Sequence, residues 1–363
     1  MMVRQYLKDL TSLIGVSSRE EAVIRYMTQK FQTYSGDVSV DNLGNVTLRI
    51  ASRKENAKKL MVFAHMDEIG FIVRKIEKNG FLRIERIGGV STQILPGFVI
   101  ELQGKKGTVK GIIGTPAHHF IKAGDKFSVP QVEDLYVDVG AASSEQVLEM
   151  GIDVGCFGAF ESRYLEMPND IICGKALDDR AGLAILMRFL DMTADRKFDW
   201  DVYVVAAVQE EFNIRGIIPT VHRIQPDAML GVDITPSCDT PDMYYNDVAL
   251  GKGPAVCYMN FHGGGTLAGV LPDKKMLEHL EKALESRGIS YQKEISPGVI
   301  TENAFTLWEN QGIPVCNLSI PTRYTHTPVE CVHAGDLEKI AAAIAGFAAD
   351  LKETTCFGKG GAY

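Results

Sequence analysis

Apolar runs of strand composition alternate with helical apolar spacing along most of the chain. The strand-like runs are KKLMVFAHMD, DVYVVAAV, DAMLGVDI and VCNLSI. Apolar runs without polar alternation are typical of strands buried on both faces of a parallel sheet. Helical spacing occupies residues 6–15 and 19–34 and the segments LDDRAGLAILMRFLDMTA, DKKMLEHLEKALESRG and DLEKIAAAIAGFAADLKE. This alternation predicts an α/β fold with a mostly parallel central sheet flanked by helices.

Residues 70–160 follow a different pattern. Short alternating strands recur there at close spacing between glycine turns, with little helical periodicity; they are FIVRKI, FLRIERI, FVIELQG and GTVKGIIG. This pattern is typical of a small β-barrel. We therefore predict two domains: an α/β domain built from residues 1–66 and 166–363, and a β-rich domain of residues 67–165 inserted into it.

Three local patterns add detail to this prediction. In VSVDNLGNVTLRI two strand-like runs flank an Asn-Leu-Gly-Asn turn, which predicts a hairpin. Ser17 and Ser18 precede the second helix, with Glu20 and Glu21 three positions on, which is a capping-box pattern. The glycine-rich stretch 260–269 is interpreted as a turn, because it does not lead from a clear strand into a helix that carries a phosphate loop's Lys and Ser/Thr.

Composition narrows the class of protein. The 363 residues are 45% hydrophobic and 23% charged, as in a folded globular chain. The net charge of -8 gives no general attraction to nucleic acid or to anionic lipid. The N-terminus lacks the apolar core of a signal peptide and no segment has the length of a membrane span, so we expect a cytoplasmic protein. The seven cysteines include no C-x-x-C pair, which argues against a disulfide framework or a thiolate zinc site, and we expect buried thiols.

Acidic residues and histidines gather where the predicted strands end. Ligands of open α/β sheets bind outside the carboxyl ends of the strands. The residues that the sequence places there are His65, Asp67, Asp178, Asp179, Glu210, Glu211, Asp233 and His326. Singly, each has a structural explanation: either aspartate of the 178–179 pair could cap a helix, and a lone histidine at a strand end is more often structural than a ligand. Together they would repel one another unless protons or cations neutralised them.

Two divalent metal ions would resolve this repulsion. Such a pair needs a bridging carboxylate and mixed imidazole and carboxylate ligands, and it is suited to hydrolysis. Zinc, cobalt and manganese accept ligands of this kind. Consecutive residues that leave a strand point in different directions, so one of Glu210 and Glu211 can bind metal while the other accepts a proton from water.

Five motifs carry a resemblance to a known family. They are AHMDEIGFIV, KALDDRAG, VQEEFNIRG, GVDIT and SIPTRYTHTPVE, which occur in the family's order across nearly the whole chain. In these motifs the chain resembles the M42 metallo-aminopeptidases, which include glutamyl and deblocking aminopeptidases and the tetrahedral TET particles. The resemblance implies a fold of the dinuclear zinc exopeptidase type and the removal of N-terminal residues from peptides. It also implies a homo-oligomer, as dimers or a tetrahedral dodecamer, assembled through the inserted domain.

The resemblance further implies a set of metal ligands. Asp178 would bridge two divalent ions, zinc or cobalt, with manganese as a third option. His65 and Asp233 would complete one ion's ligands. Glu211 and His326 would complete those of the other.

Three further residues acquire roles from the same resemblance. Glu210 would be the general base, which takes a proton from water and later delivers it to the leaving amine. Asp67 would hydrogen-bond the imidazole of His65 and determine its tautomer. Asp179 would support the bridging carboxylate and its backbone geometry.

Departures from the family's pattern concern the substrate. Asn213 stands where the family usually has a glycine, and asparagine is the non-glycine residue that best tolerates a left-handed backbone. Glu302 replaces the family's usual aspartate and would reach further into the pocket, where a carboxylate suits the ammonium of a peptide N-terminus. Arg323 and His119 are further substrate-binding candidates, with His119 reaching the active site of its own or a neighbouring subunit.

Two other functions are compatible with parts of this pattern. A dinuclear deacylase or carboxypeptidase on small peptide-like conjugates would keep the metals but need an unpaired cation for a terminal carboxylate, and Arg180 and Arg323 lie near the motifs. A third hypothesis is a binding protein that has lost its enzymatic activity. The complete ligand set with Glu210 argues against it, because decay usually removes one of these residues.

Overall fold

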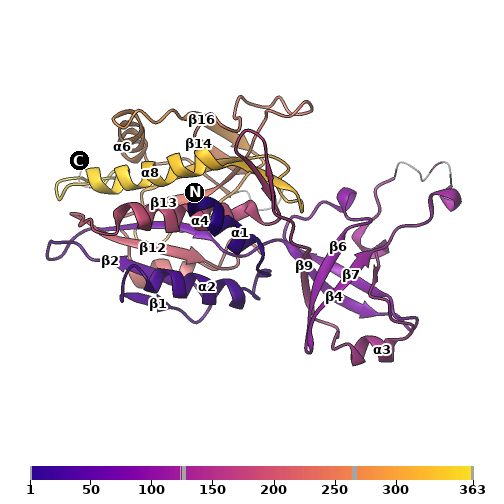
Figure 1. Ribbon diagram of the computed structural model, residues 1–363. Coiled ribbons are helices and arrows are strands. Elements are labelled where there is room, and N and C mark those ends of the chain that lie inside the picture. Colours follow the sequence, from indigo (N-terminus) through magenta and orange to yellow (C-terminus); the bar gives the residue numbers. More distant parts are fainter. Residues whose placement is uncertain (1, 123, 125–127, 264–267, 361–363) are drawn as a thin grey trace.

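The computed structural model describes residues 2–122, 124, 128–263 and 268–360, and within them its centre is a nine-stranded sheet (Figure 1). In spatial order, its strands are β1 (Val38–Val40), β2 (Val46–Ile50), β12 (Asp201–Ala207), β3 (Lys59–His65), β13 (Ala228–Pro236), β17 (Val315–Thr322), β14 (Ala255–His262) and β15 (Ala268–Val270), with β16 (Gln292–Pro297) paired to β14. The four central strands, β12, β3, β13 and β17, pair in parallel, so their carboxyl ends meet at one edge. The predicted α/β fold with a mostly parallel sheet is confirmed.

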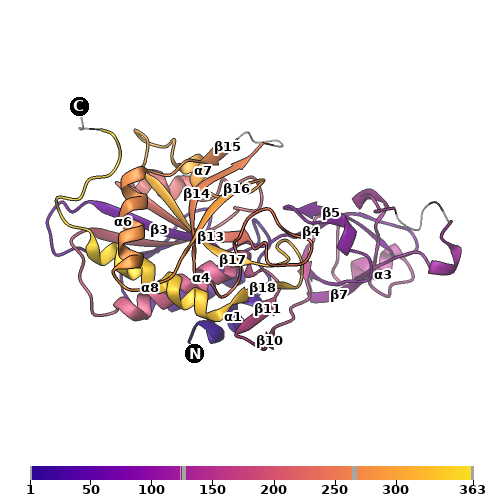
Figure 2. The same ribbon diagram turned by 90° about the horizontal axis from the view of Figure 1, so that it is seen from above.

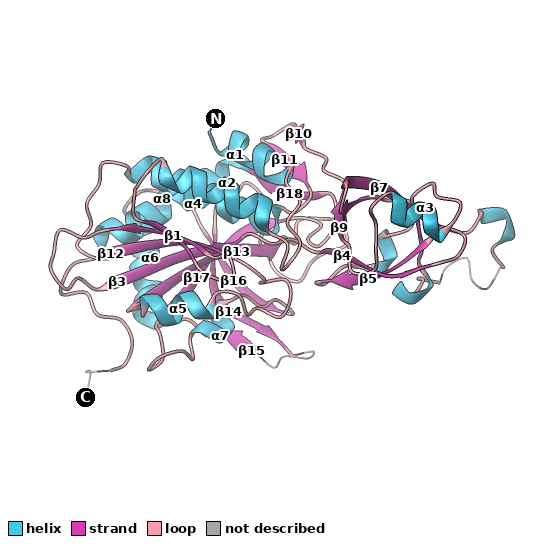
Figure 3. Cartoon of the chain, turned by 90° about the horizontal axis from the view of Figure 1, so that it is seen from below, coloured by secondary structure: helices cyan, strands magenta, loops and turns pink. Residues whose placement is uncertain are grey.

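Successive side chains of the central strands point to opposite faces of the sheet, and both faces are buried. On β3, Leu60, Val62 and Ala64 join the larger hydrophobic core, whereas Met61 and Phe63 join a smaller core on the opposite face. The helices of the larger core are α1 (Met2–Thr11), α2 (Glu21–Gln32), α4 (Leu177–Thr193), α6 (Lys274–Glu285) and α8 (Ala334–Asp350). The opposite face is covered by α5 (Ile218–Ile224) and α7 (Asn303–Thr306), as Figure 3 shows. Period-two burial on both faces explains the unbroken apolar runs in these strands.

A closed antiparallel barrel forms at one end of the molecule, beyond the central sheet (Figures 1 and 2). Around the barrel the strands are β4 (Gly70–Ile76), β5 (Leu82–Ile87), β8 (Val137–Asp138), β7 (Gly107–Ile113), β6 (Val99–Gly104) and β9 (Phe157–Phe160). It has its own hydrophobic core, which includes Phe71, Ile100 and Phe160. The segments between the barrel strands contain four short helices: η1 (Thr92–Ile94), η2 (His118–Phe120), η3 (Val132–Asp134) and α3 (Ser144–Glu149). The prediction of a small β-barrel between the two parts of the α/β fold is confirmed.

A small antiparallel sheet brings two distant segments of the chain together. It consists of β10 (Leu165–Met167), β11 (Ile171–Gly174) and β18 (Glu330–His333). β11 runs into the start of α4, and β18 follows the loop that carries His326. The pairing of β11 with β18 therefore places that loop beside the first residues of α4.

The predicted capping box is wrong. α2 begins at Glu21, and its N-cap residue Glu20 makes no side-chain cap bond. The Glu20 carboxylate instead accepts hydrogen bonds from the backbone N–H groups of Ser18 (2.9 Å) and Gln209 (3.1 Å). Ser17 Oγ donates to Asp67 at 2.6 Å. These residues serve contacts with segments far along the chain, which local helix signals do not register.

Two smaller expectations also need revision. α1 begins at Met2 and ends at Thr11, earlier than the predicted range of residues 6–15. All seven cysteines are free thiols, but Cys356 is exposed and Cys156 and Cys238 are half-buried, so the expectation of buried thiols is right for the other four. None of the described helices combines the length and apolar character that a bilayer crossing requires.

Candidate metal centre and active site

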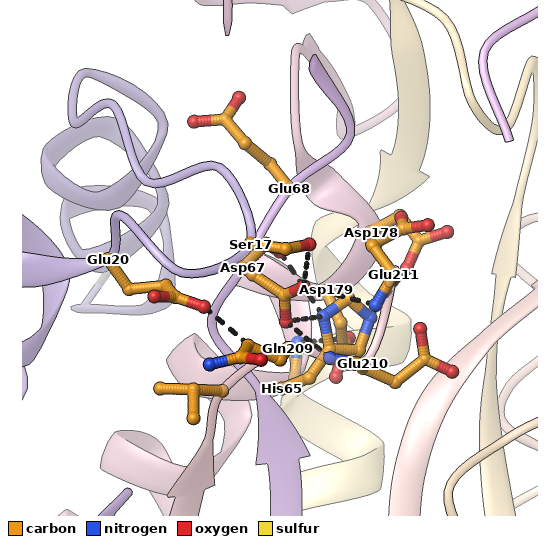
Figure 4. Close-up of polar contacts among 12 residues, drawn as sticks. Ser17, Glu20, His65, Asp67, Glu68, Asp178, Asp179, Gln209, Glu210 and Glu211 are labelled. Carbon is orange, nitrogen blue, oxygen red and sulfur yellow. Dashed lines mark hydrogen bonds and ion pairs between the residues drawn. The ribbon is translucent and has the colours of Figure 1, made fainter. Parts of the chain in front are cut away.

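The predicted site residues gather at the carboxyl edge of the parallel strands, and Figure 4 labels them except for Asp233 and His326. His65 is the last residue of β3, and Asp233 lies near the end of β13. Glu210 and Glu211 follow β12, and Asp178 lies at the start of α4. His326 comes from the loop after β17. Five separate segments thus bring imidazole and carboxylate groups to one place.

Two groups of three side chains lie within metal-binding distance, and they share Asp178. In the first, His65 Nε2 is 3.0 Å from Asp178 Oδ1 and 3.9 Å from Asp233 Oδ1. In the second, His326 Nε2 is 3.3 Å from Asp178 Oδ2 and 3.7 Å from Glu211 Oε1. Within each group the ligand atoms all lie within 4.8 Å of one another. Imidazole nitrogens and carboxylate oxygens are the donors that zinc, cobalt and manganese accept, so these residues fit a pair of such ions.

The titration behaviour of the cluster reflects its buried charge. Burial raises the pKa of Glu211 to about 8 and that of Asp233 to about 7. Burial also raises the pKa of Glu210 well above its ordinary value, with the Asp233 and Glu211 charges adding to the effect and His65 opposing it. His326 behaves in the opposite way: burial lowers its pKa, but Glu211 and Asp178 outweigh this and raise it to about 11. Buried carboxylates this close together favour the binding of protons or of metal ions, because either reduces their mutual repulsion.

Asp67 is the hub of the hydrogen bonds behind the cluster (Figure 4). Its Oδ1 lies 3.4 Å from His65 Nδ1 and accepts the Glu210 backbone N–H at 2.9 Å. Its Oδ2 accepts from Ser17 Oγ at 2.6 Å and from the Glu211 backbone N–H at 3.0 Å. The carboxylate therefore holds the backbone of both glutamates, and it faces the imidazole together with the Asp67 backbone carbonyl oxygen, which lies 3.2 Å from His65 Nδ1. The sequence predicted the first of these contacts and missed the other three.

The two aspartates at the start of α4 depart from helical geometry. The peptide bond between Asp178 and Asp179 is cis, and neither residue has helical backbone angles. Asp178 N donates to Glu330 Oε2 at 3.0 Å, and Asp179 Oδ1 accepts the Gly182 N–H at 2.9 Å. Asp179 is fully buried beside Asp178, and burial raises its pKa well above its ordinary value.

The glutamate-bearing turn after β12 needs left-handed backbone. Gln209, Asn213 and Ile214 have φ values of 58°, 75° and 51°. The turn closes through a 2.8 Å hydrogen bond from the Ile214 N–H to the Glu210 carbonyl. Asn213 thus keeps the conformation expected at the position where a glycine would be easiest.

Two residues outside the predicted set hold His326. Its Nδ1 lies 3.0 Å from the carbonyl oxygen of Gly89, so Nδ1–H can donate there while Nε2 faces the carboxylates. A Cβ on Gly89 would lie 2.6 Å from that ring, so this close approach requires glycine. The His326 backbone N–H donates to Glu330 Oε1 at 2.7 Å, and the other oxygen of Glu330 accepts from Asp178. Glu330 is the last residue of the SIPTRYTHTPVE motif, where its place four residues after His326 was the available signal.

An open cavity of about 540 Å³ lies over these residues. Its lining comprises Gly89, Asp178, Glu210, Glu211, Asn213, Ile214, Asp233, Ile234, Pro236, His262, Gly298, Val299, Ile300, Thr325 and His326. No lysine or arginine occurs in this lining, which lies wholly within the described residues. His262, which the sequence offered no reason to select, belongs to the cavity wall at the end of β14.

Residues 44–342 match the sequence profile of the family described as M42 glutamyl aminopeptidase. The chain belongs to the M42 family of aminopeptidases. It is therefore a hydrolase that acts as an aminopeptidase, and the enzymes of this family depend on metal ions. The two groups around Asp178 are residues able to hold such ions.

Individual M42 relatives match along nearly the whole chain. It is 42% identical over 351 residues to the putative aminopeptidase SgcX of Escherichia coli (strain K12), covering 96% of this chain and 94% of that one. Aminopeptidase APDkam598 from the archaeon Desulfurococcus kamchatkensis superposes with a TM-score of 0.91 at 32% identity, covering 97% of each chain. The TET1 peptidase of Pyrococcus horikoshii, which can assemble into a tetrahedron or a large octahedral shell, superposes with a TM-score of 0.85 at 27% identity, covering 96% of this chain and 100% of that one.

The three predicted substrate-binding residues of this M42 aminopeptidase lie in different surroundings. Glu302 is buried close to His65 and Asp233 but does not line the cavity. Arg323 forms a two-pronged ion pair with Asp239, from Nε at 2.8 Å and from Nη2 at 2.6 Å. His119 lies in the exposed η2 segment of the barrel region and does not line the cavity of its own chain. None of the three contacts the cavity of this chain as it is described.

Proposed function

We propose that this M42 aminopeptidase is a dinuclear metallohydrolase with Glu210 as its general base. The observation that supports this most directly is that Asp178 belongs to both ligand groups, as a bridging carboxylate must. His65 and Asp233 would hold one ion, and Glu211 and His326 the other. When bound, such ions would polarise the scissile carbonyl group. They would also lower the pKa of water, so that it loses a proton more easily and becomes a better nucleophile.

Glu210 is suited to moving a proton between water and the leaving amine. Its side chain lines the cavity and is absent from both ligand groups, so its carboxylate is left for acid-base work. Burial and neighbouring carboxylates raise its pKa toward the range in which a group can both accept and return a proton. Asp67 holds the Glu210 backbone N–H, which fixes the direction in which the side chain leaves the turn.

The charge of the cavity favours a peptide with a free N-terminal ammonium. Its carboxylates attract a cation, and no lysine or arginine of its lining, as described, would pair with a terminal carboxylate. Neither of the two arginines that could have served a carboxypeptidase lines this cavity. Arg323 is paired with Asp239, and Arg180 is fully buried, 3.6 Å from Glu68 and donating to the Leu10 carbonyl. Glu302 remains our candidate for supporting the ammonium, although it is buried beside His65 and Asp233 and lies outside the cavity wall.

The experiment is release of amino acids from X-Ala-Ala peptides, compared with their N-acetylated and C-amidated forms. Zinc, cobalt or manganese is added back singly after chelation, and Glu210→Gln is the control. We expect metal-dependent cleavage of free-amine peptides that tolerates C-amidation and is lost in the control. Cleavage confined to acylated or free-carboxylate peptides would refute the substrate class.

We further propose that residues 67–165 form an assembly domain of a cytoplasmic homo-oligomer, with residues 1–66 and 166–363 as the catalytic domain. Large apolar side chains of the barrel region are exposed, including Phe120 (88%), Val154 (58%) and Ile112 (52%), and association would cover them. The TET1 peptidase can assemble into a tetrahedron or a large octahedral shell, and a second solved structure, of PhTET1-12s, holds a dodecamer. We expect this chain to form dimers or a tetrahedral dodecamer. In such a particle His119 would face a neighbouring subunit. A monomer by light scattering at micromolar concentration would count against this.

A further inference from the structure

A second cavity adjoins the one over the metal-binding residues. It measures about 490 Å³, and its wall shares Pro236, Gly298 and Val299 with the first. The rest of the wall comes mainly from the loop after β13, including Tyr244 and Tyr245. The two cavities therefore adjoin at these three residues, and neither the predicted ligands nor Glu210 line the second one.

Distance along β13 places the second cavity relative to the scissile bond. Asp233, a proposed ligand, and Pro236, at the boundary of the two cavities, are three residues apart on one strand. An extended strand rises about 3.3 Å per residue, so the boundary lies about 10 Å from the ligand. An aminopeptidase cleaves the first peptide bond, so the first residue stays by the ligands and the chain beyond it leads away. An extended substrate also rises about 3.3 Å per residue, so its second or third residue after the cleaved bond would reach the second cavity.

The loop that forms the second cavity is anchored at its base. Asp239 accepts from Arg323 at 2.6 and 2.8 Å, from Ser237 Oγ at 2.8 Å and from the Leu250 N–H at 3.1 Å. The Cys238 N–H donates to the Val248 carbonyl at 2.7 Å, which closes the loop on itself. The loop is thereby tied both to β13, which carries Asp233, and to the segment after β17, which leads to His326. Arg323 acts in this structure as an anchor of the loop.

The chemistry of the second cavity is apolar and aromatic. Tyr244 is 85% exposed and Tyr245 66% exposed, although side chains of this size are usually half covered or more in a folded protein. Met243, Pro297 and Val299 complete an apolar wall, and Asp242 supplies its one acidic side chain. No lysine or arginine contributes to this wall, which lies within the described part of the chain.

We propose that this second cavity is a substrate subsite, which binds an aromatic or large apolar side chain two or three residues after the cleaved bond. The inference rests on the proposed aminopeptidase function and adds a preference for peptides longer than dipeptides. Tyr244 and Tyr245 supply ring faces for the side chain. Arg323 is a positioning residue, which holds the loop through Asp239.

The test compares four C-amidated peptides that share the N-terminal residue released fastest: X-Ala, X-Ala-Ala-Ala, X-Ala-Phe-Ala and X-Ala-Ala-Phe. We expect phenylalanine at position three or four to raise kcat/KM about threefold to tenfold over alanine, which is the worth of one aromatic contact. The double substitution Tyr244→Ala with Tyr245→Ala removes this gain and leaves X-Ala cleavage unchanged. Arg323→Ala reduces the gain, measured as the ratio of kcat/KM between the phenylalanine and alanine tetrapeptides.

Trp308→Ala is the matched control, because Trp308 is 76% exposed and lines neither cavity. It should retain the full preference for phenylalanine. A wild-type enzyme that is indifferent to phenylalanine, or a double variant that keeps the preference, overturns the subsite while the aminopeptidase function stands.

If no free-amine peptide is cleaved, calorimetric measurement of peptide binding tests the subsite separately from the proposed aminopeptidase function. The zinc-loaded protein is titrated with X-Ala-Phe-Ala and X-Ala-Ala-Ala amides. Tighter binding of the phenylalanine peptide that the double tyrosine variant abolishes supports the subsite although the proposed function has failed. Equal binding of the two peptides overturns the subsite as well.

Discussion

Replacing Asp67 by asparagine should damage the metal centre without changing any proposed metal ligand. Each carboxylate oxygen accepts a backbone N–H, one from Glu210 at 2.9 Å and one from Glu211 at 3.0 Å. Whichever way the asparagine amide turns, its NH2 group faces one of these N–H groups and leaves it unpaired. A buried unpaired donor costs about 1–3 kcal/mol, and the bonds that remain lose the strength of a charged acceptor. We therefore expect Asp67→Asn to lower the free energy of unfolding by about 3 kcal/mol.

Stability alone does not identify the role of Asp67, so metal affinity and turnover are measured too. Loss of a partner behind a metal-bound histidine typically costs about 10- to 100-fold in metal affinity or activity. We expect both to fall in Asp67→Asn, by calorimetric zinc titration and by kcat on the best peptide, and to fall about threefold to tenfold in Ser17→Ala, which loses one of the four contacts. Asp336→Asn is the control, since each oxygen of the buried Asp336 carboxylate also accepts one backbone N–H, from Gly251 at 2.6 Å and from Gly253 at 2.9 Å, and Asp336 belongs to neither ligand group. Normal zinc affinity and normal kcat in Asp67→Asn would refute this reasoning.

Three other measurements test separate parts of the site. Glu210→Gln should lose about 10²- to 10⁴-fold in kcat and keep its zinc affinity by calorimetry, because the side chain belongs to neither ligand group; near-normal turnover would remove it as the base. Chelation should lower the thermal midpoint, and zinc at 100 times its dissociation constant should restore about 2.7 kcal/mol; a midpoint indifferent to zinc would argue against these ligands. Burial and the Asp67 charge raise the pKa of Glu20 to about 7 from 4.5, so its ionisation costs folding stability as pH rises between those values. Urea unfolding should therefore find Glu20→Gln more stable than wild type at pH 8, by up to about 3 kcal/mol, and equal to it at pH 4; the same difference at both pH values would contradict this origin.

The parts of the fold that sequence predicted are those governed by local pattern. β3, β12, β13 and β17 have apolar side chains on both faces, so their runs stand out, and their ends identify the rim where His65, Glu210, Glu211 and Asp233 lie. The sequence did not predict β14 and β16. β16 alternates buried and exposed residues, β14 ends in residues that are mostly only partly buried, and the pairing of the two strands shifts register between Cys257 and Met259. Pattern reading is reliable where both faces of a strand are buried.

Contacts between distant segments account for what sequence reasoning missed at the site. Ser17 and Glu20 fit a helix cap by composition, and nothing nearby indicated that they would reach Asp67 and Gln209. Gly89 contacts His326 through its backbone carbonyl oxygen. Every residue has such an oxygen, so residue type does not indicate which one becomes a partner. Arg323 looked like an available cation until the structure paired it with Asp239. In each case the partner is selected by the folded chain and not by neighbouring residues.

The order of the proposed ligands along the chain determines when the proposed metal centre can form during synthesis. His65 comes before the barrel and Asp178 after it, and His326 follows six more strands of the central sheet. Chains emerge from the ribosome at about 5–20 residues per second, and compact units fold as they appear. The barrel can thus fold while the catalytic half is unfinished, and the second ligand group stays incomplete until residue 326 has been made. A nascent copy of this peptidase therefore carries no hydrolytic centre until most of its own chain has left the ribosome.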